Sequence, residues 1–412
     1  MDKRIGIIGA GVAGLHLGLH LRRHNGPVTI VTDREPEAYA GSKLINTVAH
    51  HHITLERERG LGIGHWDDRD HHYFCHHHYF GGSQPLHFRG DFAAPSRAVD
   101  YRLYLPALMR DFIAAGGEIE YRQVAADDLS RLAARFDLVV VSTGKGVLGH
   151  MFDHREELSP FDRPQRMLSV GLYTGIRDAD PRGVTLSVSP GQGELIEIPT
   201  LTFDGMATAL LFENIPGGDL EVLARMSYDD DPKGFIQTVL DKLEAHHPTV
   251  YDRVDKARFG IRGSVDLLQG GIVPTVRQSY VALDDTTLAV ALGDVHAVMD
   301  PMVGQGANMA SHAAVVLGEE IVAQDVFDAR FVETVDRRRN DRVLSALRWT
   351  NLMLAPPSDD LLMLIGTMSA DRALADEFTN NFNYPERQWD RLASPARIRA
   401  WLAERETARA AA

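Results

Sequence analysis

The sequence predicts an α/β fold, in which a nucleotide-binding domain is interrupted along the chain by a β-rich domain and followed by a helical region. Three observations lead to this prediction. An apolar strand near the N-terminus runs into a glycine-rich turn and a helix, the stretch 165–285 is dominated by strands of alternating polarity, and the pattern after residue 304 is mostly helical.

The first element is an apolar strand at Ile5–Ile8, which leads into the segment Gly9-Ala10-Gly11-Val12-Ala13-Gly14 and a leucine-rich helix. A G-x-G-x-x-G pattern between a strand and a helix is typical of a Rossmann-like dinucleotide site. Gly9 permits the tight turn, Gly11 lets the backbone approach a pyrophosphate, and Gly14 lets the helix pack on the strand. The helix start adds N–H groups that favour phosphate, and Ala13 belongs to this cofactor segment.

The second strand, Val28–Val31, completes a βαβ unit with a parallel sheet. Asp33 follows it, nineteen residues after Gly14, and can accept a hydrogen bond from a ribose hydroxyl. Arg34 can stack on an adenine or reach a phosphate, or it is a solvated surface residue.

The next elements continue the nucleotide domain after an interruption. Residues from about 47 to 96 are rich in histidine, glycine and aromatic residues and show no helical period, which predicts no helix there. A helix over Asp100–Ala114, a strand near Glu118–Tyr121 and a buried strand at Leu138–Val141 follow. We assign Gly144, at the end of that strand, to the cofactor site.

The second half of the chain distinguishes FAD from NAD. The strand Leu288–Leu292 ends in Gly293-Asp294, and a glycine-rich helix start follows about ten residues later. A carboxylate at this strand end can hold ribityl hydroxyls, and N–H groups at the helix start can face the flavin pyrimidine, where negative charge accumulates on reduction. The cofactor residues assigned here are Asp294, Pro301, Gly304, Gly306, Ala307 and Asn308.

This bipartite pattern resembles the FAD-binding elements of the p-hydroxybenzoate-hydroxylase superfamily. Arg102, in the pattern R-x-x-L-x-x-L, resembles the flavin-contacting arginine of that superfamily, and a surface helix arginine is the alternative.

The predicted domains are an FAD-binding domain of residues 1–46, 94–150 and 285–325, a β-rich substrate domain of residues 47–93 and 151–284, and a helical C-terminal region of residues 326–412.

Composition excludes several classes of function. The net charge of −14 argues against nucleic acid and against docking on anionic lipid, since both need a basic face. Cys75 is the only cysteine, so no intramolecular disulfide forms and a reducing compartment is expected. No signal peptide fits before the first strand, and no apolar run approaches the roughly 20 residues of a membrane span. We expect a cytoplasmic protein that does not bind membranes.

The sequence also lacks machinery for reducing the flavin. There is no second G-x-G-x-x-G, and the only Asp-Gly pair, Asp204-Gly205, lacks the serine and arginine that follow it in single-component hydroxylases. Reduced flavin is therefore expected to arrive from elsewhere.

Long segments are similar to one family. The residues that carry the resemblance are 9–16, 44–50, 94–102, 193–200 and 381–389. They resemble the epoxidase component of two-component styrene and indole monooxygenases. The resemblance implies that a separate NADH-dependent reductase delivers reduced FAD and that O₂ converts it to a C4a-hydroperoxyflavin. That species passes an oxygen atom to a vinyl-aromatic such as styrene, and the family also suggests a homodimer.

The resemblance also implies a set of pocket residues, and their pattern looks styrene-type: Asn46, Val48, His50, Tyr73, His76 and Ser96. Asn46 and Thr47 are the candidate catalytic residues, placed beside the flavin ring to hydrogen-bond the flavin or the peroxide. Val48 and Tyr73 would contact a flat hydrocarbon. His50, His76 and Ser96 would order the loop or the flavin edge. Lys43 departs from the arginine expected at its position.

Other readings stay open at this point. The histidine runs 50–52 and 76–78 suggest a metal site, but neighbouring strand residues point to opposite faces, so we predict no metal. An indole monooxygenase of the same family and a non-catalytic FAD-binding regulator are the main alternatives. A dehydrogenase would not need Gly293-Asp294, and the tryptophan motif of flavin-dependent halogenases is absent.

Overall fold

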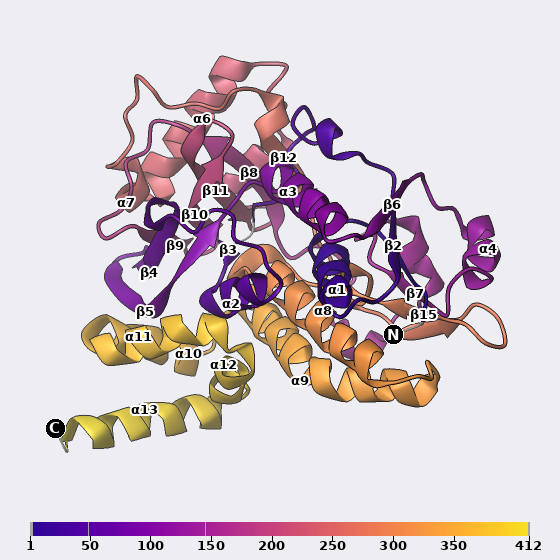
Figure 1. The fold of residues 1–412 in the computed structure, drawn as a ribbon. Coiled ribbons are helices and arrows are strands. Elements are labelled where there is room, and N and C mark those ends of the chain that lie inside the picture. The colour runs from indigo at the N-terminus through magenta and orange to yellow at the C-terminus, as the bar shows by residue number, and fades with distance from the viewer. Residues whose placement is uncertain (1–2, 48, 145, 411–412) are drawn as a thin grey trace.

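Two large sheets organise the computed structural model, which describes residues 3–47, 49–144 and 146–410 (Figure 1). The nucleotide sheet has six strands in the order β14-β15-β7-β1-β2-β6. Its strands are parallel except at the β14–β15 edge. The bounds of these strands are β1 Ile5–Ile8, β2 Val28–Thr32, β6 Glu118–Tyr121, β7 Leu138–Val141, β14 Tyr280–Ala282 and β15 Leu288–Ala291.

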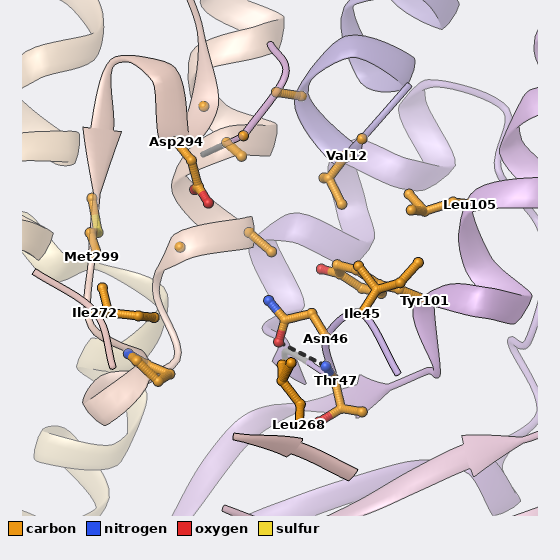
Figure 2. Close-up of a pocket in the computed structure, with 18 of the residues that line it drawn as sticks. Val12, Ile45, Asn46, Thr47, Tyr101, Leu105, Leu268, Ile272, Asp294 and Met299 are labelled. Atoms are coloured by element: carbon orange, nitrogen blue, oxygen red, sulfur yellow. Dashed lines mark hydrogen bonds between the residues drawn. The ribbon is translucent and has the colours of Figure 1, made fainter. Parts of the chain in front are cut away.

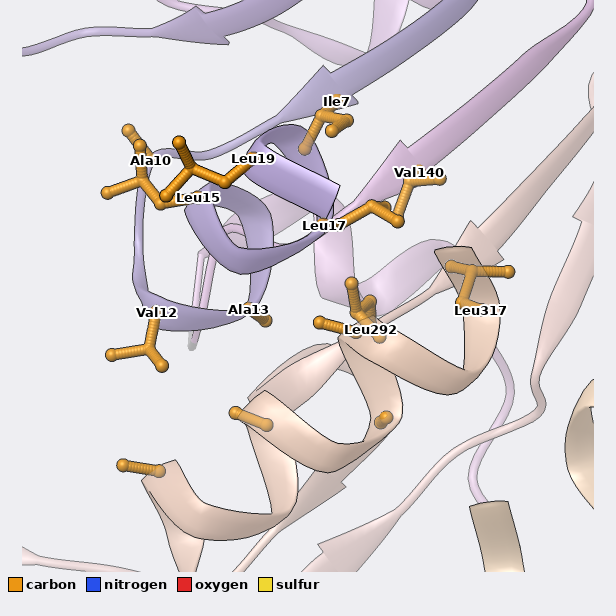
Figure 3. Packing of buried hydrophobic residues seen from close by; sticks show 14 of the residues in the cluster. Ile7, Ala10, Val12, Ala13, Leu15, Leu17, Leu19, Val140, Leu292 and Leu317 are labelled. Carbon is orange, nitrogen blue, oxygen red and sulfur yellow. The ribbon is translucent and has the colours of Figure 1, made fainter. Parts of the chain in front are cut away.

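The core of this domain surrounds α1 (Val12–Arg23), as Figure 3 shows. Leucines at every second position of α1 lie on two opposite sides of the helix, and Leu15, Leu17 and Leu21 are fully buried. A helix with apolar residues on opposite sides must be covered on both. The strands β1 and β2, α3 (Tyr101–Ala114) and α8 (Gly306–Ala323) provide that cover.

The second sheet has eight strands in the order β12-β8-β11-β10-β9-β4-β5-β3 and is antiparallel except between β4 and β9. It corresponds to the β-rich domain expected from the sequence. Its strands are β3 Ala49–His50, β4 His72–Phe80, β5 Leu86–Ala98, β8 Met167–Tyr173, β9 Gly183–Ser189, β10 Gly193–Thr202, β11 Gly205–Asn214 and β12 Leu267–Gly271. A small ladder pairs β13 (Thr275–Val276) with β16 (Ala297–Val298).

Helices of the C-terminal region lie against the strands β4 and β5 of this sheet (Figure 1, yellow). The contact of α11 with β5 is close: a Cβ built on Gly90 would come within 2.1 Å of the Thr379 hydroxyl. The helices of this region are α9 Ala329–Leu354, α10 Asp359–Ala370, α11 Arg372–Asn380, α12 Pro385–Leu392 and α13 Pro395–Ala410. The remaining helices are α2 His52–Gly60, α4 Leu129–Ala133, α5 Val222–Arg225, α6 Pro232–His246 and α7 Pro248–Tyr251.

The predicted α/β class and the helical C-terminal region are confirmed, and the predicted strands at Ile5–Ile8, Glu118–Tyr121 and Leu138–Val141 coincide with β1, β6 and β7. The prediction that no helix forms between residues 47 and 96 was wrong, because α2 forms there. Its sequence, HITLERERG, has no apolar stripe, and tertiary contacts bury Thr54, Leu55 and Glu58 instead. Among the described residues, no helix is both long and apolar enough to cross a membrane.

Two predicted domain boundaries differ from the observed sheets by a few residues. Strand β14 joins the nucleotide sheet although it precedes the boundary at 285, and residues 94–98 belong to β5 of the eight-stranded sheet. The chain therefore passes between the two sheets a few residues away from the predicted points.

Candidate functional site

A cavity of about 990 Å³ is lined by residues of both sheets and of the helices between them (Figure 2). One end lies at the carboxyl ends of β1 and β2, the usual ligand position in an open parallel sheet. The predicted cofactor residues that line it are Gly9, Gly11, Ala13, Asp33, Arg34, Gly144, Asp294, Pro301, Gly304, Gly306 and Ala307. The structure thus brings together segments that lie up to about 300 residues apart in the chain.

Two helices begin at this end of the cavity. Gly11 and Gln305, the residues that precede α1 and α8, make no side-chain capping hydrogen bond. The first residues of both helices, Val12, Ala13, Gly306 and Ala307, line the cavity. Backbone N–H groups at helix starts attract anionic groups. The arrangement fits a dinucleotide, with a pyrophosphate at one helix start and an electron-rich ring at the other.

Open space around particular glycines supports the same fit. A Cβ built on Gly11, Gly144, Gly304 or Gly306 would meet no atom within 4 Å, although all four residues line the cavity. Gly14 is different, because a Cβ there would lie 2.1 Å from the Gly9 carbonyl oxygen. Gly14 does not line the cavity, and it instead allows α1 to pack against the glycine-rich turn.

Asn308 also lies outside the cavity wall, and it joins the start of α8 to the segment that carries β3 and α2. Its side-chain oxygen accepts hydrogen bonds from the His51 backbone N–H at 3.0 Å and the Thr54 hydroxyl at 2.7 Å. Its amide nitrogen donates to the carbonyl oxygens of Ala49 and Gly304. One side chain thereby holds the glycine-rich helix start beside the pocket segment.

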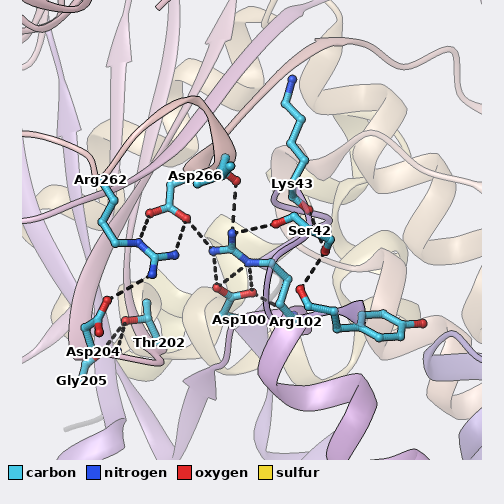
Figure 4. A network of polar contacts seen from close by, with 11 residues as sticks. Ser42, Lys43, Asp100, Arg102, Thr202, Asp204, Gly205, Arg262 and Asp266 are labelled. Atoms are coloured by element: carbon cyan, nitrogen blue, oxygen red, sulfur yellow. Dashed lines mark hydrogen bonds and ion pairs between the residues drawn. The ribbon is translucent and has the colours of Figure 1, made fainter. Parts of the chain in front are cut away.

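Arg102 does not line the cavity either and sits in a buried ionic cluster (Figure 4). Its guanidinium donates to Asp100 at 2.6 Å and to Asp266 at 2.7 Å, and its Nη1 donates to the carbonyl oxygens of Ser42 and Val265. Asp266 is also paired with Arg262. The cluster ties α3 to the segment before β12 and to residues 42–43. The flavin contact expected of Arg102 remains a prediction.

The inner end of the cavity is apolar and is formed by one face of the eight-stranded sheet. Alternate residues of neighbouring strands point into it, as period-two side-chain geometry requires. The residues are Leu168 and Val170 of β8, Val184 and Leu186 of β9, Ile196 and Ile198 of β10, and Leu211 of β11, with Leu268, Ile272, Met302, Val303 and Phe382 around them. These residues are not among those predicted from the sequence. Their alternation predicts strands, but nothing local indicates which face borders a cavity.

The predicted pocket residues divide into two groups. Asn46, Thr47, Tyr73 and His76 line the cavity, and Asn46 Oδ1 accepts a hydrogen bond from the Thr47 N–H at 2.8 Å (Figure 2). Two others are buried behind the wall: Ser96 stands opposite Tyr73 in the β4–β5 ladder, and His50 lies beneath Tyr101. Val48 lies outside the described residues.

Aromatic rings form the wall at His76. Its ring meets Phe92 and Phe382 edge-to-face, at centroid distances of 4.7 and 4.5 Å, and His51 lies beside the same two rings. Burial lowers the pKa of His51 to about 3 and that of His76 well below its usual value. Both imidazoles are therefore neutral at physiological pH, so this wall carries no charge toward an apolar ligand.

Other reactive groups do not converge on the cavity. Cys75 is buried away from its wall, and burial raises the pKa of its thiol to about 12, which disfavours the reactive thiolate. Within residues 3–47, 49–144 and 146–410, no group of three or more His, Cys, Asp or Glu side chains has an arrangement that could hold a metal ion.

A pair of buried acids lies beside the flavin-binding segment predicted at Pro301. Glu213 of β11 and Asp300 are both fully buried and interact with each other, and no donor of the described residues reaches either Glu213 oxygen. A hydrogen bond between the two carboxyl groups needs a proton on one of them, because an ionised carboxylate only accepts. Burial raises the pKa of both groups, and the charge of Asp300 raises that of Glu213 further. Asp300 also accepts the Met302 N–H at 3.0 Å, so the shared proton joins the substrate sheet to the cofactor loop.

Glu213→Gln is therefore expected to change the free energy of unfolding by less than about 1 kcal/mol at pH 8, because a neutral amide replaces an acid whose ionisation is opposed by burial and by Asp300. The matched control is Glu197→Gln on the neighbouring strand, whose carboxylate is paired with Arg253. That variant is expected to lose about 1.5–3 kcal/mol, the usual contribution of a hydrogen bond to a charged group. Urea unfolding of both variants measures the difference, and equal losses would contradict the shared proton.

Comparison with known proteins identifies similar sequences along the whole chain. Residues 144–253 match a family described as the styrene monooxygenase A putative substrate binding domain. Styrene monooxygenase StyA of Pseudomonas fluorescens is 55% identical over 407 residues, which cover 97% of this chain and 98% of that protein. Styrene monooxygenase StyA of a Pseudomonas sp is 54% identical over 410 residues, with 98% of each chain covered.

Solved structures share the fold at low sequence identity. The flavin-dependent brominase Bmp2 superposes with a TM-score of 0.69 at 17% identity, over 99% of this chain and 100% of its own. PqsL of Pseudomonas aeruginosa, a probable FAD-dependent monooxygenase, gives 0.62 at 14% identity, over 92% and 99%. A flavoprotein/dehydrogenase from Cytophaga hutchinsonii gives 0.67 at 12% identity, over 95% and 94%. These likenesses confirm the predicted flavoprotein fold of the p-hydroxybenzoate-hydroxylase type.

Proposed function

Because the chain belongs to the styrene monooxygenase family, we propose that it uses FAD and O₂ to epoxidise styrene or a related vinyl-aromatic in the cavity between its two sheets. The FAD is bound non-covalently and is delivered in its reduced form by a separate NADH-dependent reductase. One observation carries the proposal: the nucleotide end and the apolar end belong to one continuous cavity. A flavin held at the helix starts would therefore border directly on the space for a hydrocarbon.

The residues at the nucleotide end fit FAD. Gly11 and the first turn of α1 would receive the pyrophosphate, and Asp33 at the end of β2 would accept a ribose hydroxyl. Asp294 would hold the ribityl chain, and the start of α8 would face the pyrimidine ring. Bound reduced FAD supplies the activation of O₂. The chain itself contributes binding, orientation and the exclusion of water.

The residues at the apolar end would orient the substrate. A flat hydrocarbon offers no hydrogen-bonding group, so its position depends on shape and on the apolar face of the sheet. Leu186, Ile198 and Leu211 supply part of that face, and the neutral His76 and Phe382 supply an aromatic wall. Asn46 and Thr47 stand between the two ends and are proposed to hydrogen-bond the flavin or the activated oxygen.

The proposed delivery of already reduced FAD is supported by the sequence, which carries one G-x-G-x-x-G and no usable Asp-Gly motif for NAD(P)H. The expected result is that NADH alone does not bleach FAD bound to the purified protein. Absorbance at the flavin band measures this directly.

A homodimer stays a prediction of the family resemblance, and light scattering of the purified protein tests it.

The function is tested by mixing the purified protein with chemically reduced FAD, oxygen and styrene and analysing the products by chiral chromatography. Styrene oxide is expected. Oxygenation of indole but not styrene would overturn the substrate assignment, and oxidised FAD with hydrogen peroxide as the sole products would overturn the monooxygenase assignment.

A variant that fills the apolar end of the cavity tests whether styrene reacts there. Ile198→Trp is expected to lower styrene epoxidation at least about tenfold while FAD affinity stays within about threefold of wild type, because the new ring occupies only the apolar end. Loss of FAD binding in this variant would contradict the proposed division of the cavity.

Gly11→Ala separates cofactor binding from folding. Gly11 has φ −79° and ψ −176°, which alanine adopts easily, and the new methyl group would meet no protein atom within 4 Å. We expect unchanged thermal stability and an FAD affinity at least about tenfold lower, because the methyl group enters the space reserved for the pyrophosphate. Fluorescence titration with FAD measures the affinity. Gly366→Ala, at an equally open position in α10, is the control that should leave FAD binding unchanged.

A further inference from the structure

Tyr101, the first residue of α3, brings its side chain to the cavity wall (Figure 2). A buried chain of hydrogen bonds lies behind it. Its hydroxyl is 2.9 Å from Nε2 of His50, and Nδ1 of His50 is 2.6 Å from Oε1 of Glu58. The relative exposures of the three residues are 6%, 3% and 0%. Three separate elements, α3, β3 and α2, supply the three groups.

Glu58 determines where the protons of this chain reside. Its carboxylate also accepts from the Tyr104 hydroxyl at 2.7 Å and is paired with Arg97. Burial raises the pKa of Glu58, but His50 and Arg97 outweigh that effect and hold the pKa at about 2. An ionised Glu58 can only accept, so Nδ1 of His50 must carry a proton. Nε2 then faces the Tyr101 oxygen, where it accepts when the ring is neutral and donates when it is charged.

The proposed reaction needs one proton at the cavity in each turnover. Anionic reduced FAD brings two electrons and one hydrogen, and O₂ gives one oxygen atom to the alkene. The other oxygen atom leaves as water, which takes two hydrogens, and oxidised FAD is released. One hydrogen comes from the flavin, so one further proton must come from outside the reactants.

We propose that Tyr101 donates this proton and that His50, held in place by Glu58, immediately restores it. The transfer starts from the charged form of His50, which donates through Nε2 to the Tyr101 oxygen. The proton moves from the Tyr101 hydroxyl to the oxygen atom that leaves as water, and the proton on Nε2 of His50 moves to the Tyr101 oxygen. His50 ends neutral, with its remaining proton on Nδ1 toward Glu58, and takes up a proton from solvent before the next turnover. The proposal rests on the proposed function, since it assigns a proton source to that reaction.

The surroundings favour this coupled transfer. Burial, the negative charge of Glu58 and that of Asp294 raise the pKa of Tyr101 well above its usual value, so a lasting phenolate is disfavoured and its proton must be replaced as it leaves. His50 is a positioning residue that acts through Tyr101. The charged and titratable groups around the relay are Glu58 and Arg57 of α2, Arg97 of β5, Tyr104 of α3, His16 of α1, His51 beside β3, and Asp294.

The activity test compares two conservative variants on α3. Tyr101→Phe keeps the ring and removes the hydroxyl that faces the cavity, whereas Tyr104→Phe removes a hydroxyl that bonds Glu58 without lining the cavity. With reduced FAD and styrene, Tyr101→Phe is expected to form epoxide at least about tenfold more slowly at pH 8 and to recover part of that loss toward pH 6. Tyr104→Phe is expected to stay within about threefold. Equal loss in both variants, or an unchanged pH profile in Tyr101→Phe, would overturn the proposal.

A second readout needs no cofactor and no turnover. In the apoprotein at pH 8, the ¹⁵N shifts of His50, assigned by comparison with His50→Gln, are expected to show the proton on Nδ1. Glu58→Gln is expected to weaken that tautomer preference, because a neutral amide replaces the anionic acceptor. A neutral ring that carries its proton on Nε2 and none on Nδ1 in the wild type would overturn the relay. If the wild type makes no epoxide but shows the proton on Nδ1, the proposed function fails and the arrangement of the three side chains stands.

Discussion

Arg102→Met is expected to lower the free energy of unfolding by about 3–5 kcal/mol, the usual cost of removing one partner from a buried ion pair. Arg102 and Asp100 are almost wholly buried, and the side chain of Asp266 is 3% exposed. Without the guanidinium, two carboxylates face each other in a region that excludes water. Thermal and urea unfolding measure the loss.

The control for this prediction lies in the same cluster. Arg262 also pairs with Asp266, but its side chain is 46% exposed. Arg262→Met is expected to cost less than about 1 kcal/mol, because solvent screens the charge that remains. A similar loss in both variants would contradict the account of Arg102 as the buried centre of the cluster.

The Arg102→Met variant also tests the flavin contact that the sequence suggests for Arg102. Because Arg102 does not line the cavity, folded Arg102→Met is expected to bind FAD within about threefold of wild type at a temperature well below its unfolding. A loss of FAD affinity beyond the loss of stability would instead support a direct contact.

Acidification from pH 7 to pH 5 is expected to lower the melting temperature by about 10 °C. Burial lowers the pKa of His16 to about 4 and those of His51, His78, His247 and His312 to about 3, from the usual 6.5. The unfolded chain therefore binds more protons than the folded one below pH 6.5. Stability is full above that pH and falls toward pH 4 by up to about 1.4 kcal/mol per pH unit for each such histidine.

A single variant tests the histidine origin of this effect. His78 stacks on Phe88 in the buried part of β4, so His78→Phe keeps an aromatic ring and removes one titrating group. It is expected to flatten the dependence of melting temperature on pH, whereas His87→Gln, at an exposed position of β5, should leave it unchanged. A pH dependence that appears only below pH 4 would point to carboxylates and contradict the prediction.

Most of the nucleotide site could be predicted from the sequence because its residues act through short-range geometry. The turn 9–14 joins one strand to one helix, and the segment 301–308 does the same in the second half of the chain. Such patterns can be recognised in a short stretch of sequence, because each glycine is required either by a nearby backbone atom or by the space that a ligand needs. The family resemblance added Asn46, Thr47, Tyr73 and His76, which line the cavity.

Other features escaped sequence analysis because they depend on partners far along the chain. Helix α2 has no apolar period, and it is held by Glu58, which meets His50, Arg97 and Tyr104 from three other elements. The placement of His50 was inferred by family resemblance as part of the pocket, yet it lies behind Tyr101 and not in the wall.

By itself, the sequence determined that this is an α/β flavoprotein with a dinucleotide turn, a β-rich insertion and a helical end, because periodicity and glycine spacing are local properties. Only the tertiary structure decided which sheet face borders the cavity and which polar side chains reach it. Leu168 and Leu195 are both buried strand leucines, but only Leu168 lines the cavity. That difference arises from how the two sheets and the helices pack together, and no local pattern records it.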